Sequence, residues 1–211
     1  MLTERTVPRI MDFALAKRSK ILSRALFPPS STLVRVGGLA AMVAATTRIS
    51  ADLVSFFAAF APISYAVLHF RDSVADWTGG LLLIGLVALY ARQWKAFGVP
   101  GLIGFLEAFV GMMLAQWDFV WPSVLASLGW VFLGAVSLDA EAYPGVAALI
   151  LIVGAGLSGL ANTLVESGLL LRSPLYVAGA MSADIIFNAA IAWLGFSLFT
   201  GGSKSVLYPR Q

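Results

Sequence analysis

Polar side chains that could bind or conduct a solute stand inside the most apolar stretches of this chain. Residues 154–166 read GAGLSGLANTLVE, and Ser158, Asn162 and Glu166 follow one another at intervals of four residues. At about 100° per residue, these side chains share one face of a helix. An unsatisfied polar group in lipid costs several kcal/mol. We therefore expect this face to point into a protein interior.

Two further apolar stretches carry polar groups of the same kind. Glu107 lies near the middle of 101–117, and Asp184 and Asn188 lie one helical turn apart within 175–199. An acidic residue near the bilayer midplane costs roughly 2.5–3.5 kcal/mol on insertion scales. Carboxyl groups at that depth are costly enough to indicate a functional or packing role.

The charge balance indicates what these groups could do. No basic residue lies deep enough to pair with all three carboxyl groups, although Arg48 could approach one from a helix end. Buried carboxyl groups without cations become protonated or bind a cation. We therefore predict that an ion or solute path is lined by Glu107, Asp184, Asn188, Asn162 and Glu166. The alternative is that the acids are neutral, bond between helices and only hold the bundle together.

Catalytic and cofactor sites receive less support. The string from Gly156 to Gly159 has the form GxSG, but a serine nucleophile needs a base, and the only histidine, His69, precedes it at a helix end. His69 is a candidate axial ligand for a haem or chlorophyll-type pigment, or an ordinary interfacial histidine. The chain has no cysteine. We expect no enzyme activity, no metal site and no bound cofactor.

Composition sets the class of protein. Of the 211 residues, 59% are hydrophobic and 12% are charged, and the mean hydropathy is +0.88. Soluble domains carry roughly 25% charged residues, and a spanning helix needs about 20 mostly apolar residues. The sequence therefore predicts an all-α, polytopic integral membrane helical bundle.

We expect six to seven transmembrane helices between residues 32 and 200. The stretch 32–47 is short enough to be a half-helix, which leaves the number open. Polar residues 71–77 and 92–100 are predicted to be loops, and the six tryptophans are expected near helix ends, as in interfacial belts. The predicted helices cover 32–47, 53–70, 78–92, 101–117, 122–138, 145–166 and 175–199.

The two ends of the chain differ from this bundle. Residues 1–31 interleave six cations with apolar residues at helical spacing, which predicts a basic amphipathic segment lying on anionic lipid headgroups; the alternative is a solvated basic tail. Residues 201–211 are expected to form a polar tail. The N-terminal positive charge favours a cytoplasmic N-terminus, and we expect a multi-pass protein of the bacterial inner membrane.

Two functions fit these features. The first is a small membrane transporter or channel for an ion or small solute, with intramembrane carboxylates lining the path. The second is a non-catalytic transmembrane subunit of a larger complex, whose small-residue faces would dock on other membrane subunits or on further copies of this chain. The expected partners are the lipid bilayer and those subunits, with no nucleic acid. A lipid-modifying enzyme ranks last, because no nucleophile–base pair or metal-binding motif is recognisable.

Overall fold

Five α-helices make up the described part of the chain. The computed structural model describes residues 31–58, 60, 65–115, 120–140, 143–166 and 174–201. The all-α prediction is confirmed for these residues, whereas the basic segment and the polar tail lie almost entirely outside them. The helices are α2 (Ser31–Ala58), α3 (Tyr65–Leu114), α4 (Val120–Asp139), α5 (Gly145–Glu166) and α6 (Pro174–Thr200).

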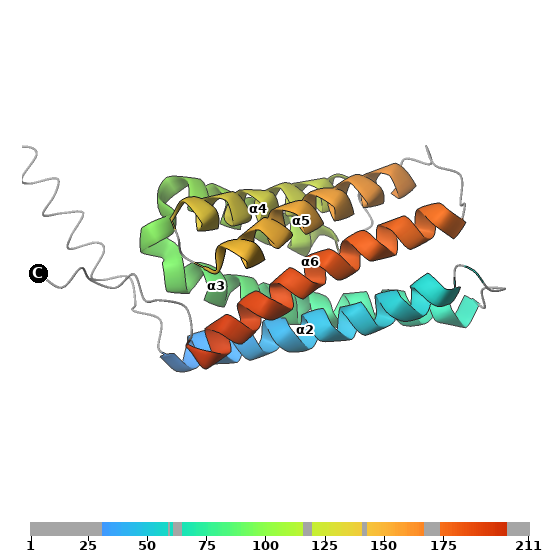
Figure 1. The fold of residues 1–211 in the computed structure, drawn as a ribbon, viewed down its shortest axis with the longest axis horizontal. Coiled ribbons are helices and arrows are strands. Elements are labelled where there is room, and N and C mark those ends of the chain that lie inside the picture. Colours follow the sequence, from blue (N-terminus) through green and yellow to red (C-terminus); the bar gives the residue numbers. More distant parts are fainter. Residues whose placement is uncertain are drawn as a thin grey trace, which may run out of the picture. The chain divides into compact units, whose positions relative to one another are not determined.

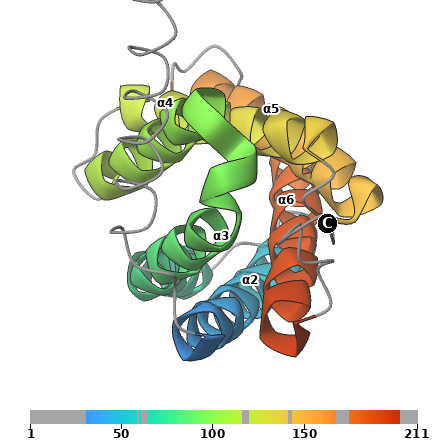
Figure 2. The same ribbon diagram turned by 90° about the vertical axis from the view of Figure 1, so that its left-hand side faces the viewer.

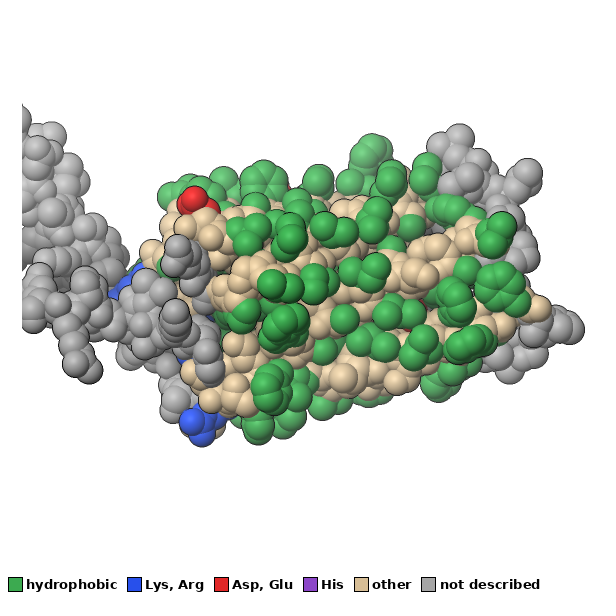
Figure 3. All heavy atoms as spheres, in the orientation of Figure 1, with side chains coloured by type: hydrophobic (Ala, Val, Ile, Leu, Met, Phe, Trp, Pro, Cys, Tyr) green, Lys and Arg blue, Asp and Glu red, His purple; other side chains and the backbone are tan. Residues whose placement is uncertain are grey.

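The described helices have the length and surface of membrane spans. All five are long and apolar enough to cross a bilayer, and apolar side chains cover much of the face seen in Figure 3. The predicted count of six to seven spans is not confirmed, since five such helices are found within the described ranges.

The helices form a closed ring in which each packs against the next and α6 returns to α2 (Figure 2). The closing contact depends on glycine, because a Cβ on Gly38 would lie 2.7 Å from the carbonyl oxygen of Gly195. Small residues of this kind let two helix backbones approach closely in a membrane. Ring closure therefore follows from residue size at this crossing.

The long helix α3 is two helices joined at a sharp break (Figure 1). Gly98 has φ 57° and ψ −153°, and Pro100 follows it. The rings of Tyr90 and Phe105 stack with centroids 4.5 Å apart, whereas fifteen residues of straight helix would separate them by about 22 Å. The chain therefore reverses at Gly98. We call residues 65–97 the first arm of α3 and 99–114 its second arm.

Three predicted boundaries in the first half of the chain are wrong. Helix α2 runs unbroken through residues 48–52, α3 begins at Tyr65, and the predicted loops 71–77 and 92–97 are helical. The polar residues in these segments bond within or between helices: Ser50 donates to the carbonyl of Thr46 at 3.0 Å. Polarity in these segments therefore does not mark a loop.

One half of the ring is filled with apolar side chains. This closed half contains the start of α2, the break in α3, the end of α4, the start of α5 and the end of α6. Tyr143, next to α5, donates a hydrogen bond of 2.9 Å to the carbonyl oxygen of Leu89. The largest fully buried side chains there are Phe97, Leu86, Leu133, Leu151, Leu194 and Leu198.

Candidate functional site

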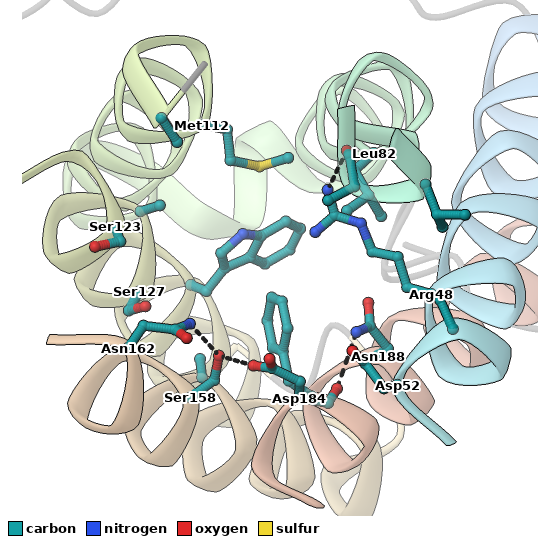
Figure 4. A pocket seen from close by; sticks show the side chains of 18 of the residues that line it. Arg48, Asp52, Leu82, Met112, Ser123, Ser127, Ser158, Asn162, Asp184 and Asn188 are labelled. Carbon is teal, nitrogen blue, oxygen red and sulfur yellow. Dashed lines mark hydrogen bonds between the residues drawn. The ribbon is translucent and has the colours of Figure 1, made fainter. Parts of the chain in front are cut away.

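A cavity of about 410 Å³ occupies the other half of the ring (Figure 4). It lies toward the end of the bundle at which α2 ends, α4 begins and α6 begins. All five helices contribute, α3 through both of its arms. Its polar or charged lining residues are Arg48, Asp52, Asp76, Ser123, Ser127, Ser158, Asn162, Asp184 and Asn188, and its apolar ones include Leu82, Met112, Trp130 and Phe187.

The polar column of α5, formed by Ser158 and Asn162, faces this cavity because glycines lie on both sides of the column. A Cβ on Gly154 would lie 2.7 Å from the backbone of Phe187 in α6, and one on Gly159 would lie 2.5 Å from the Ser127 side chain in α4. Both neighbouring helices therefore approach α5 closely. The strip between the two contacts carries Ser158 and Asn162 and turns toward the centre of the ring.

The column of α5 is joined to α6 through Asp184. Ser158 donates a hydrogen bond to the Oδ1 of Asp184, and Asn162 Nδ2 donates to the Ser158 hydroxyl at 3.4 Å. Asp184 is 9% exposed. This chain of hydrogen bonds fixes a carboxyl group on the cavity wall, as Figure 4 shows.

Asn188 lies one helical turn beyond Asp184, and its side-chain oxygen accepts no hydrogen bond from the described residues. Its Nδ2 donates to the backbone carbonyl oxygen of Asp184 at 2.9 Å. Its Oδ1 is buried and has no hydrogen-bond partner among the described residues, although the side chain is only 2% exposed. A buried amide oxygen in this state costs about 1–3 kcal/mol, which indicates a binding position.

Arg48 enters the cavity from α2 and is anchored on the first arm of α3. Its Nε donates to the Thr78 hydroxyl at 2.8 Å, and its Nη2 donates to the carbonyl oxygen of Ala75 at 2.9 Å. Thr78 is fully buried. Arg48 therefore joins α2 to α3 and supplies the one guanidinium of the described lining.

Three carboxyl groups of the lining differ in exposure. They belong to Asp52 of α2, Asp76 of the first arm of α3 and Asp184 of α6. Asp76 is exposed, whereas the other two are buried. The described lining therefore has an excess of acidic groups, of which two are buried and one is exposed.

Aromatic side chains complete the inner wall. Trp130 of α4 and Phe187 of α6 meet edge to face, with ring centroids 5.7 Å apart, and both line the cavity. Trp130 is 3% exposed in the middle of α4. The expectation that all six tryptophans lie near helix ends is therefore wrong for this one.

The structure brings together three of the predicted site residues, namely Asp184, Asn188 and Asn162. Glu107 is not part of the lining. It lies between Gly104 and Gly111, which pack on α4, and its Oε2 is buried without a hydrogen-bond partner among the described residues. The side chains of Glu166 and His69 lie outside what the structure describes, so their predicted roles stay predictions.

Sequence reasoning missed Asp52, Asp76 and the inward-facing Trp130. A signal existed for the first: Arg48, Ala51 and Asp52 have the spacing i, i+3, i+4 that also places Asp184, Phe187 and Asn188 on one face of α6. The predicted break between two helices at residues 48–52 leaves Asp52 outside any helix face.

Known proteins give no further guide to the site. In the described ranges, no group of three or more His, Cys, Asp or Glu side chains is placed to hold a metal ion. Comparisons of the chain with protein families, with curated proteins and with solved structures found no match.

Proposed function

We propose that this protein is a membrane transporter for a small polar solute and that the cavity is its binding site. The observation that carries the proposal is a hollow of about 410 Å³, lined by Asp184 and Asn188, inside a ring of apolar spans. Sites for small molecules have volumes of roughly 300–1,000 Å³. Ionisable residues within a membrane span mark solute or ion pathways by default.

The contrast between the two halves of the ring supports a carrier. Polar groups line the hollow half, and large apolar side chains such as Phe97, Leu133 and Leu194 fill the closed half. A carrier that alternates access exposes its site to one side while the other side is packed shut. The arrangement matches one state of such a cycle.

Charge distribution supports an orientation in which the cavity faces away from the cytoplasm. In this proposal the two arms of α3 count as separate passes, so α2 begins and α6 ends on the same side of the membrane, at the closed half. Positive charge favours the cytoplasmic side. Eleven of the fourteen Lys and Arg residues lie, along the sequence, before or early in α2, near the reversal of α3 or after α6, namely Arg5, Arg9, Lys17, Arg18, Lys20, Arg24, Arg35, Arg92, Lys95, Lys204 and Arg210.

The test is uptake into liposomes that contain the purified chain alone. Four labelled probes, ethylammonium, glycine, propionate and glycerol, cover the cationic, zwitterionic, anionic and neutral classes. We expect at least one to enter faster than into protein-free liposomes, and we expect Asp184→Asn to abolish that uptake. Asp139→Asn, at the exposed end of α4, is the matched control and should transport normally. No uptake of any probe would overturn an autonomous transporter.

A second candidate, a transmembrane subunit of a larger complex, is favoured by Glu107. Its buried Oε2 has no partner among the described residues, and Leu106 and Val110 beside it are exposed. A partner helix that packs on Leu106 and Val110 would cover the exposed apolar face beside this carboxyl group. This candidate would be supported if the chain is recovered only together with other subunits and shows no uptake activity once it is separated from them.

A further inference from the structure

We infer that the solute bound in the cavity is a small organic ammonium ion, whose N–H groups donate hydrogen bonds to the Asp184 carboxylate and to the Asn188 Oδ1. The inference rests on the proposed function, because it names the substrate class of the same cavity.

The acceptor on Asn188 requires a donor from outside the described chain. Its side chain is 2% exposed, its Nδ2 donates to the backbone carbonyl of Asp184, and its Oδ1 has no hydrogen-bond partner among the residues that the structure describes. Figure 4 shows Asn188 and Asp184 together on the cavity wall. A ligand that brings N–H groups would satisfy the amide oxygen and meet the carboxylate one helical turn away. An anion or an acceptor-only ligand would satisfy neither.

The charge of the lining favours a cation. Among the described lining residues, Asp52, Asp76 and Asp184 stand against one guanidinium. That guanidinium, on Arg48, donates to Thr78 and to the carbonyl of Ala75 on α3. The excess of carboxyl groups, two of them buried, would attract a cation into the cavity toward Asp184. In a low-dielectric interior, charges attract more strongly than in bulk water.

The size and aromatic character of the cavity favour an organic cation over a metal ion. A volume of about 410 Å³ exceeds what a bare ion fills. Trp130 and Phe187 form an edge-to-face pair beside Asp184, and aromatic faces attract ammonium groups within about 6 Å. The described residues offer no cluster of three metal-binding side chains.

Binding can be measured on the full-length chain in detergent without any transport. Calorimetry and thermal unfolding would compare ethylammonium with 1-propanol, propionate, sodium and potassium. The ions would be supplied as chloride or sodium salts, and all samples would have the same ionic strength. We expect saturable heat and a raised Tm with ethylammonium alone. Saturable binding of propionate or propanol, or of sodium or potassium in preference to ethylammonium, would overturn the inference.

Two variants test the two acceptors. Asp184→Asn should weaken ethylammonium binding at least about tenfold, the expected loss of a charged hydrogen-bond partner. Asn188→Leu should also weaken binding, because it removes the Oδ1 acceptor, and its Tm shows whether the variant is folded after losing the Nδ2 bond to the Asp184 carbonyl. This second variant keeps the inference testable if Asp184→Asn does not fold. Asp139→Asn should bind as the parent does.

The outcomes separate the inference from the proposed function. Ethylammonium binding without uptake in liposomes would leave the ligand class standing and overturn transport. Uptake of propionate or glycerol, with no ammonium binding, would leave transport standing and overturn the ligand class. Unchanged ethylammonium affinity in a folded Asn188→Leu variant would also overturn the inference.

Discussion

Tyr90 stacks on Phe105 across the break in α3, with the ring centroids 4.5 Å apart and 22° between the ring planes. Phe97, next to the break, lies against Tyr90 at 6.2 Å and against Tyr143 at 6.3 Å. These rings hold the two arms of α3 side by side. Because both arms also line the cavity, through Leu82 and Met112, the reversal at Gly98 positions the site.

Gly98→Ala should destabilise the protein. Gly98 has φ 57° and ψ −153°, a region that is essentially restricted to glycine and costs other residues on the order of 1–3 kcal/mol. We expect the free energy of unfolding in mixed micelles to fall by about that amount. Equilibrium unfolding by SDS titration, followed by circular dichroism, would measure it.

Gly80→Ala is the matched control for this substitution. Gly80 lies in the first arm of α3, and a Cβ there would meet no atom within 4 Å. Alanine in a helix interior is favoured over glycine by roughly 0.5–1 kcal/mol, so this variant should be as stable as the parent or more stable. Equal stability of the two variants would contradict a strained reversal at Gly98.

Thr78→Val should loosen the connection between α2 and α3. The Thr78 hydroxyl accepts the Nε–H of Arg48 at 2.8 Å and is fully buried. Valine has nearly the same volume but cannot accept the hydrogen bond. Leaving a charged donor without this acceptor should cost about 1–3 kcal/mol, measured as the change in the free energy of unfolding.

Thr47→Val controls for the loss of a hydroxyl from a membrane helix. Thr47 donates only to the carbonyl of Val43, one turn back in α2, at 2.7 Å. Its substitution should change stability by less than about 0.5 kcal/mol. If both threonine variants lose the same stability, the bond to Arg48 contributes nothing specific.

The bundle class and most of the second half of the fold could be predicted from the sequence. Apolar stretches closed by proline or glycine marked α4, α5 and α6 to within a few residues, because Pro122, Pro144, Pro174 and Gly201 lie at their ends. The column of Ser158 and Asn162 was correctly expected to face a protein interior. Helical periodicity and the free-energy cost of polar groups in lipid are sufficient to predict the direction in which these two side chains face.

The first half of the chain and part of the site could not be predicted in this way. Arg48 is polar enough to indicate a helix end, and its hydrogen bonds to Thr78 and Ala75 lie on a different helix that the sequence does not show. Glu107 was expected in the cavity from its depth alone. Depth does not fix the direction of a side chain, and the glycines beside Glu107 turn that face toward α4.

Alkaline pH should destabilise the closed half through Tyr143. Burial raises the pKa of this phenol above its ordinary value of about 10, and the nearby charge of Arg92 opposes the shift. Below pH 10 the phenol is neutral in both the folded and unfolded chain. Above it, only the unfolded chain ionises readily, so stability is lost as pH rises, by up to about 1.4 kcal/mol per pH unit. Unfolding measured between about pH 9 and pH 11 would show the slope.

Tyr143→Phe should remove that slope while lowering stability at neutral pH by about 0.5–1.5 kcal/mol, since the bond to Leu89 is lost. Tyr176→Phe is the control, because the Tyr176 hydroxyl also donates to a carbonyl oxygen, that of Ala161 at 2.6 Å. It should keep the parent's alkaline slope. An unchanged slope in Tyr143→Phe would show that other groups cause the pH dependence.

Single cysteines can determine which side of the membrane the cavity faces, since the chain has none of its own. Asn162→Cys places a thiol in the lining, and Asp139→Cys places one at the exposed end of α4 in the closed half. In intact cells, a membrane-impermeant cationic thiol reagent should modify the first variant and spare the second. In inverted vesicles the pattern should reverse.

The charge of the reagent tests the lining itself. Because Asp52, Asp76 and Asp184 outnumber Arg48 in the described lining, a cationic thiosulfonate should react with Asn162→Cys faster than an anionic one of similar size. Asp184→Asn in the same background should narrow that ratio, whereas the ratio at Asp139→Cys should stay the same. A ratio that favours the anionic reagent would mean that Arg48 dominates the field in the cavity, and the carboxyl groups would then be neutral.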